Sequence, residues 1–382
     1  MIMTGKAARN AAPGVSRNRM PDRTIPAIGA VPNRALVRPA PRPRIAWMNR
    51  TMLNLKYSYR EIPMRKIFTL LCGLLIYCAP LHAQELYLLG GSIGDTASGD
   101  RSYTWSLGYI QALGEYTAVS FSWLNEGHLP NNHRDGPTVQ LWGRTKRIDN
   151  QFVLAAGVGP YYYYDTELAK SGRGFSDAHG LGGVFSLAGF WYTESPWVIQ
   201  LRTNLVKTNN IDTYSAMVGV GYQLDYSPAR GPSSETGPPR VKTTDNEITV
   251  FIGQTTVNSA NSPQSLAQSI EYRRGIARYI DWTIAWLNEG DNRLIRRNGI
   301  LSQAWLVRTF FDEHLALGVG LGPYFLVDTR GDEDRYTVAG AITFSASYRF
   351  NPNWLVRLFW NRIATTYNRD TDVIMIGPGY RF

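Results

Sequence analysis

The chain has 382 residues and a formal net charge of +10. Such a charge fits a nucleic-acid or membrane partner, but the excess is local. Residues 1–63 hold twelve Lys and Arg against two acidic residues, and without residues 1–83 the chain is close to neutral. This distribution excludes a basic nucleic-acid surface in the main body. The sequence contains no phosphate-binding loop, Cys cluster or cofactor fingerprint, so no nucleic-acid partner and no cofactor are expected.

The N-terminal segment predicts export. Arg65 and Lys66 precede an apolar run that is too short to cross a bilayer as a helix, and a cleavage site follows near Ala83. This arrangement is typical of a Sec signal peptide over residues 64–83. Residues 1–63 are rich in Pro and Arg and are interpreted as a disordered extension or as the product of a misassigned start codon.

Both cysteines of the chain, Cys72 and Cys78, lie inside the predicted signal peptide. The exported protein would therefore contain no cysteine and no disulfide.

A long internal repeat organises the rest of the chain. The hexapeptide WLNEGH at 123–128 returns as WLNEGD at 286–291, and GVGPYYYYDT returns as GLGPYFLVDT at the same offset of 163 residues. The two copies cover residues 84–226 and 246–382, and a linker rich in Pro, Gly and Ser joins them over 227–245. A period of this length indicates a duplicated domain and not a solenoid repeat.

Apolar and polar residues alternate through each copy, as in VSFSWLN, and this pattern predicts β-strands. Eight strands are expected in the first copy, near 86–94, 103–112, 117–125, 137–146, 151–163, 181–192, 197–207 and 213–224. Short connections such as LGEY, RIDN and TESP alternate with longer polar ones such as EGHLPNNHRDG and DTELAKSGRGFSDAHG. Short turns on one side and long loops on the other, with tryptophans near strand ends, are typical of transmembrane barrels.

We therefore predict an all-β fold, a transmembrane antiparallel β-barrel. A sheet in hydrocarbon must close because every backbone N–H needs a partner. The Pro-rich linker favours two tandem eight-stranded barrels. The alternative is one sixteen-stranded barrel, which would hold a water-filled lumen and act as a passive channel.

The chain ends in GPGYRF, and its Gly377, Tyr380 and Phe382 resemble the closing-strand signal of bacterial outer-membrane proteins. The exported chain resembles small eight-stranded barrels of that kind, such as the OmpA transmembrane domain and the lipid A deacylase barrels. The resemblance implies location in the Gram-negative outer membrane, within the cell envelope. It also implies contact with outer-membrane lipids and lipopolysaccharide, and membrane insertion by an assembly machinery that reads Gly377, Tyr380 and Phe382.

The repeated WLNEG motif has a structural interpretation. Strand parity directs Glu126 into the lumen at the rim of its strand, where an arginine such as Arg202 or Arg357 could pair with it, and Gly127 would allow a β-bulge. Bulges are also expected at Pro160 and Pro323, because proline removes a ladder donor.

A second interpretation is catalytic. Glu126, His128 and His179 are the candidate catalytic residues, because carboxylates and imidazoles carry out general acid–base chemistry. The lipid A deacylase barrels use a His-x-Ser pair, which this chain lacks, so their activity is not transferred. A lipid acyl ester hydrolase in the first barrel is kept as an alternative.

His133, Asp135 and Asp165 are the candidate metal ligands. The His-x4-His spacing of HLPNNHRD suits a metal only on a helix, and this segment is expected to be a loop. The primary hypothesis is an integral outer-membrane protein with a structural or surface-binding role, to which no catalysis is assigned.

Overall fold

The computed structural model describes residues 84–168, 174–224, 244–259, 261–330 and 333–382. The predicted leader (1–63) and signal peptide (64–83) and nearly all of the linker lie outside these residues. The first eight strands are β1 (Gln84–Asp95), β2 (Arg101–Ala112), β3 (Thr117–Leu129), β4 (Asn132–Arg144), β5 (Phe152–Leu168), β6 (Phe175–Tyr192), β7 (Trp197–Lys207) and β8 (Thr213–Gln223). The second eight are β9 (Asn246–Val257), β10 (Gln264–Ala277), β11 (Ile280–Asp291), β12 (Arg296–Phe310), β13 (Leu315–Arg330), β14 (Glu333–Arg349), β15 (Trp354–Ala364) and β16 (Thr371–Arg381).

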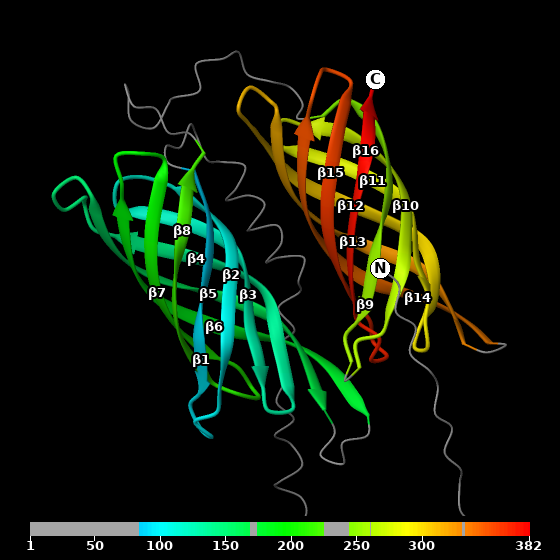
Figure 1. Ribbon diagram of the computed structural model, residues 1–382, viewed down its shortest axis with the longest axis horizontal. Coiled ribbons are helices and arrows are strands. Elements are labelled where there is room, and N and C mark those ends of the chain that lie inside the picture. Colours follow the sequence, from blue (N-terminus) through cyan, green and yellow to red (C-terminus); the bar gives the residue numbers. More distant parts are fainter. Residues whose placement is uncertain (1–83, 169–173, 225–243, 260, 331–332) are drawn as a thin grey trace, which may run out of the picture. The chain divides into compact units, whose positions relative to one another are not determined.

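The strands form two closed antiparallel barrels, β1–β8 and β9–β16 (Figure 1). The first barrel closes where β1 pairs with β8, with Leu88 opposite Val220. The second closes where β16 pairs with β9, with Ile376 opposite Ile252. Two tandem eight-stranded barrels are thus confirmed. The sixteen-stranded alternative is wrong, because β8 returns to β1 and each sheet closes on itself.

Within the described residues, no helix is long and apolar enough to cross a bilayer. Most strand segments alternate between an inward and an outward face. β7 is typical, with every second residue exposed from Trp197 to Lys207 and the residues between them buried. Its outward Leu201 is 58% exposed, and the outward Leu187 of β6 is 66% exposed. Apolar residues thus form the outer wall, and the lumen holds polar side chains together with buried apolar ones such as Leu89 and Trp142.

In the first barrel, the β3–β4 and β5–β6 hairpins are longer than expected and their loops are shorter. The segment 126–136 was predicted as a loop, but β3 and β4 continue through it to a tight turn at Pro130 and Asn131. β5 and β6 likewise extend to Leu168 and Phe175. Polar side chains do not prevent pairing there, because the antiparallel ladder satisfies the backbone of each strand whatever the side chains are.

The bulges predicted at Pro160 and Pro323 are wrong. Pro160 lies opposite Gly183 in an unbroken register between β5 and β6, and Pro323 lies opposite Gly340 in the same way. A β-carbon on the preceding Gly159 would lie 1.8 Å from the carbonyl oxygen of Val139. The glycine therefore lets β5 approach β4 very closely, and the strand passes this point without gaining a residue.

Candidate functional site

The WLNEG motif builds a β-bulge in each barrel. The register between β3 and β4 shifts after Asn125, and the register between β11 and β12 shifts after Asn288. Gly127, at φ 68°, adopts the left-handed conformation that favours glycine. Its backbone N–H donates to Oδ1 of Asn125 at 2.9 Å. Glu126 points into the lumen, as strand parity predicts, and the extra residue returns His128 to the outer wall.

Glu126 pairs in the lumen with Arg134, eight residues later on β4. Both side chains are almost fully buried, at 1% and 2% exposure. Thr213 of β8 donates to the same carboxylate. The Arg134 guanidinium also donates to the hydroxyl of Thr208 and to the carbonyl oxygen of Ile211, both at 2.8 Å. The pair thus ties the β3–β4 hairpin to the loop between β7 and β8 across the lumen.

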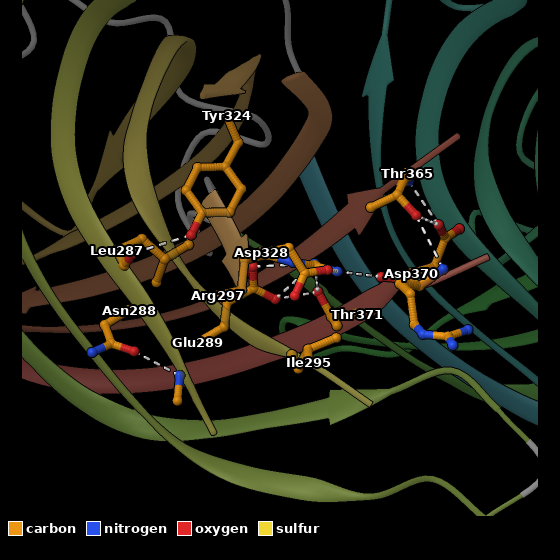
Figure 2. Close-up of polar contacts among 12 residues, drawn as sticks. Leu287, Asn288, Glu289, Ile295, Arg297, Tyr324, Asp328, Thr365, Asp370 and Thr371 are labelled. Atoms are coloured by element: carbon orange, nitrogen blue, oxygen red, sulfur yellow. Dashed lines mark hydrogen bonds and ion pairs between the residues drawn. The ribbon is translucent and has the colours of Figure 1, made fainter. Parts of the chain in front are cut away.

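The second barrel repeats this arrangement (Figure 2). Nη1 of Arg297 donates to both carboxylate oxygens of Glu289 at 3.2 Å, and Thr371 donates to that carboxylate at 2.5 Å. Arg297 also donates to the carbonyl oxygen of Arg369 at 2.9 Å and lies 3.6 Å from Asp328. Glutamate, arginine, threonine and loop carbonyl therefore recur at equivalent positions, so the motif has a structural role that each copy repeats.

The arginines proposed from the sequence as partners were wrong. Arg202 donates to the Tyr87 hydroxyl at 3.0 Å and lies over the Trp142 ring at 4.9 Å. Arg357 pairs instead with Glu247 at 2.6 Å and with Glu271 at 3.0 Å. The signal that could have identified the true partners is the shared spacing of eight residues, from Glu126 to Arg134 and from Glu289 to Arg297.

A second polar layer crosses each lumen. In the first barrel, Gln140 donates to Ser186 at 2.8 Å, Ser186 to Asn204 at 2.7 Å, and Asn204 to Ser215 at 3.2 Å. These side chains come from β4, β6, β7 and β8, so the chain of hydrogen bonds spans the interior. Equivalent residues of the second barrel, Gln303, Thr343 and Asn361, form the same layer. The lumens are filled with side chains, as an eight-stranded barrel requires.

The candidate catalytic residues are not brought together. Glu126 lies in the lumen, whereas His128 and His179 face outward, so the barrel wall separates the carboxylate from both imidazoles. The strand β6 also places Ser176 and His179 on opposite faces. This arrangement contains no nucleophile–base pair of the kind that ester hydrolysis needs.

The candidate metal ligands also divide between the two faces. His133 and Asp135 point outward from β4, and Asp165 points inward from β5, where Asn132 donates to it at 2.5 Å. Within the part of the chain that the structure describes, no three His, Cys, Asp or Glu side chains form a group that could hold a metal ion. The three residues therefore do not share one site.

Gly377 and Tyr380 lie on β16, the strand that closes the second barrel against β9, and Phe382 follows it. A β-carbon on Gly377 would lie 1.8 Å from the carbonyl oxygen of Val250, so only glycine fits beside β9. Tyr380 faces outward and packs against Trp354 with ring centroids 5.1 Å apart. Phe382 follows the strand and its backbone N–H donates to Asn246 at 2.9 Å.

The fold and its lumens define a class, the closed eight-stranded antiparallel β-barrel, which occurs twice in this chain. No family model and no curated protein matches the sequence. Among solved structures, the N-terminal β-barrel domain of Pseudomonas aeruginosa OprF is similar with a TM-score of 0.31 and 10% identity, over 37% of this chain and 97% of that chain.

Two further solved structures are similar to this chain over a comparable share of its length. Neisserial surface protein A has a TM-score of 0.29 and 12% identity, over 36% of this chain and 97% of that chain. Ail, the attachment invasion locus protein of Yersinia pestis, has a TM-score of 0.28 and 11% identity, over 37% of this chain and 95% of that chain. At these scores and identities, the likeness carries no conclusion about activity.

Proposed function

We propose that this chain is an integral protein of the bacterial outer membrane whose two barrels cross the bilayer. It serves there in a structural or surface-binding role without catalysis. The observation that carries the proposal is the apolar outer wall of each closed barrel. Large apolar surfaces on a folded protein need a partner or a membrane, and a closed barrel is one of the two structures that can span hydrocarbon.

The strand β8 gives the height of this apolar wall. Its outward face carries Ala216, Val218 and Val220 between the exposed ring of Tyr214 and the half-buried ring of Tyr222. The two tyrosines are about 27 Å apart along the strand at ~3.4 Å per residue. A strand tilt of about 40° reduces this to roughly 21 Å, close to the apolar band of known transmembrane barrels, which aromatic girdles border.

The filled lumens support a role other than conduction. The buried ion pairs and the hydrogen-bonded layer of amide and hydroxyl side chains occupy the interior of both barrels. We expect no stepwise current when the protein is inserted into planar bilayers. A regular unitary conductance would contradict the filled lumen and revive the channel hypothesis.

Export and assembly follow from the same proposal. A Sec signal ending near Ala83 would deliver the chain to the periplasm. Outer-membrane lipids and lipopolysaccharide would surround the two walls, and an assembly machinery would read the terminal strand with Gly377, Tyr380 and Phe382. The polar hairpin tips would then face outward, where surface binding takes place.

Cell fractionation tests the location. We expect the chain in the outer-membrane fraction, resistant to extraction by alkaline carbonate, with faster migration in unheated than in heated gel samples. Recovery as a soluble periplasmic protein would contradict the proposal.

Fatty-acid release from outer-membrane lipids tests the absence of catalysis. We expect no release from the folded wild-type protein. Release that is abolished by Glu126→Ala or His128→Ala would make the first barrel a hydrolase and overturn this part of the proposal.

A further inference from the structure

We propose that His128 and His133 form a two-imidazole site for a divalent transition-metal ion, of the class of Cu²⁺, Ni²⁺ and Zn²⁺, on the outer wall of the first barrel. The two residues are direct cross-strand partners near the tip of the β3–β4 hairpin. Their rings lie with centroids 4.3 Å apart and an interplanar angle of 25°. Two imidazoles on one face of a hairpin at this separation can both reach one ion.

The hairpin creates this proximity, and the sequence spacing alone does not. A turn at Pro130 and Asn131, the latter at φ 60°, joins the two strands directly. Strand parity without a bulge would direct His128 into the lumen, and the bulge at Gly127 returns it to the face that carries His133. The His-x4-His spacing normally suits a metal site on a helix. Here the tight antiparallel turn brings the two histidines of this spacing together on one face of the hairpin.

Asn125 holds His133 in the protonation state that a metal ligand needs. The backbone N–H of Gly127 donates to Oδ1 of Asn125 at 2.9 Å, which fixes the orientation of that amide. Its Nδ2 therefore faces Nε2 of His133, at 3.2 Å. An amide N–H can only donate, so Nε2 must present a lone pair and the ring is neutral. A metal ion would take the place of the amide hydrogen at that lone pair.

His128 is held through its backbone, and its ring is exposed. Its backbone N–H donates to Oγ of Ser102 at 2.8 Å, and its ring meets the edge of Tyr103 with centroids 5.8 Å apart. The side chain is exposed, so it can rotate toward an ion beside His133 without displacing packed residues.

The second barrel lacks this site at the equivalent position. The residues 163 positions later are Asp291 and Arg296, which are also cross-strand partners and form an ion pair at 3.7 Å. The duplication thus preserved a paired position and filled it with opposite charges in one copy and with two imidazoles in the other. In the Asp291–Arg296 pair each charge neutralises the other, whereas two neutral imidazoles offer two lone pairs to a cation.

The ligand set selects the class of ion. Imidazole suits copper, nickel and zinc, whereas calcium and magnesium prefer oxygen ligands. No third His, Cys, Asp or Glu joins the pair within the described residues, so water would complete the coordination shell. For such a site, affinity should follow the general order for divalent metals, with Cu²⁺ above Ni²⁺ and Zn²⁺.

Metal titration of the full chain, purified in detergent, tests the proposal. Cu²⁺ binding is measured by calorimetry, and electron paramagnetic resonance reports the number of coordinating nitrogens. We expect one site with two imidazole nitrogens, weaker binding of Ni²⁺ and Zn²⁺, and no binding of Mg²⁺. Loss of either histidine should weaken Cu²⁺ binding by about a hundredfold, because the second imidazole acts at high effective concentration.

The variants include matched controls. His128→Ala and His133→Ala each remove one ligand, and the double variant His128→Asp with His133→Arg installs the ion pair of the second barrel. His179→Ala and His314→Ala remove histidines elsewhere and should leave binding unchanged. Heat-modifiable gel migration confirms that each variant is folded. Absence of Cu²⁺ binding, or binding that survives loss of the His128–His133 pair in a folded protein, would overturn the proposal.

Discussion

Glu126 and Arg134 form a buried ion pair that joins the β3–β4 hairpin to the loop between β7 and β8. The glutamate comes from the bulge and the arginine from the strand opposite, so two neighbouring strands provide both charges. The same arrangement returns with Glu289 and Arg297. In a buried ion pair, each charge replaces the water that the other has lost. Removal of one partner therefore leaves an uncompensated charge inside the barrel.

Arg134→Met should destabilise the first barrel strongly. The substitution leaves the Glu126 carboxylate buried without its cation, and breaking a buried pair in this way costs about 3–5 kcal/mol. Urea unfolding of the protein in lipid vesicles measures the free energy of unfolding. Arg297→Met should have the same effect on the second barrel.

Two comparisons make this prediction specific. Glu126→Gln combined with Arg134→Met removes both charges and should recover a large part of the lost stability. Arg101→Met, at an exposed position at the start of β2, should change stability by less than about 0.5 kcal/mol. A loss from Arg134→Met no larger than that from Arg101→Met would show that the ion pair is unimportant.

Gly127→Ala should destabilise the first barrel through the backbone. The residue lies at φ 68°, and an added β-carbon would lie 2.0 Å from the carbonyl oxygen of Tyr103. A strained backbone conformation costs about 1–3 kcal/mol, and relief of the clash must move β2 or β3. Gly143→Ala is the matched control, because nothing lies within 4 Å of its added carbon. Equal effects of the two substitutions on urea unfolding would argue against the bulge.

The sequence predicted the architecture well because alternation and duplication are local signals. All eight strands of the first copy were found, and parity correctly directed Glu126 into the lumen. Parity gives the face on which a residue lies, but the height of that residue in the barrel depends on strand tilt and stagger. Arg202 was for that reason chosen as a partner although it contacts Tyr87 and Trp142.

The sequence missed the hairpin tips for a different reason. The polar composition of 126–136 suggested a loop, although the backbone pairs through it. The relationship between His128 and His133 was therefore hidden, since spacing along the chain says nothing about register across a turn. Only the combination of a bulge at Gly127 and a tight turn at Asn131 brings the two imidazoles together.

Asp212 should titrate below the ordinary pKa of an aspartate. It lies in the loop between β7 and β8, where Lys207 donates to it at 2.5 Å and the backbone N–H of Thr208 at 3.2 Å. The Lys207 hydrogen bond and then the Thr208 hydrogen bond lower the pKa of the Asp212 carboxyl below its ordinary value. The stabilisation of the loop is therefore complete at neutral pH and is lost as the pH falls through this lowered pKa.

Carbon-detected nuclear magnetic resonance measures this titration. The Asp212 carboxyl should show a lower midpoint in the folded protein than in the urea-unfolded chain, and Lys207→Met should raise it. A folded midpoint at or above the unfolded one would contradict the hydrogen bonds to Asp212.

Tyr380→Ala should impair assembly in cells more than it impairs stability. Tyr380 packs on Trp354 at 5.1 Å, and Tyr222 packs on Trp197 at 5.0 Å in the first barrel. The two contacts are nearly identical, but Tyr380 belongs to the terminal strand and Tyr222 to an internal one. Refolded in vitro, Tyr380→Ala and Tyr222→Ala should therefore lose similar stability, since each removes an equivalent aromatic pair, worth about 0.5–1.5 kcal/mol beyond its buried area.

In cells, the fraction that migrates as folded protein should fall much further for Tyr380→Ala, and for deletion of Phe382, if the terminal strand is read during insertion. Equal folded fractions for Tyr380→Ala and Tyr222→Ala would show that the terminal strand acts only through packing.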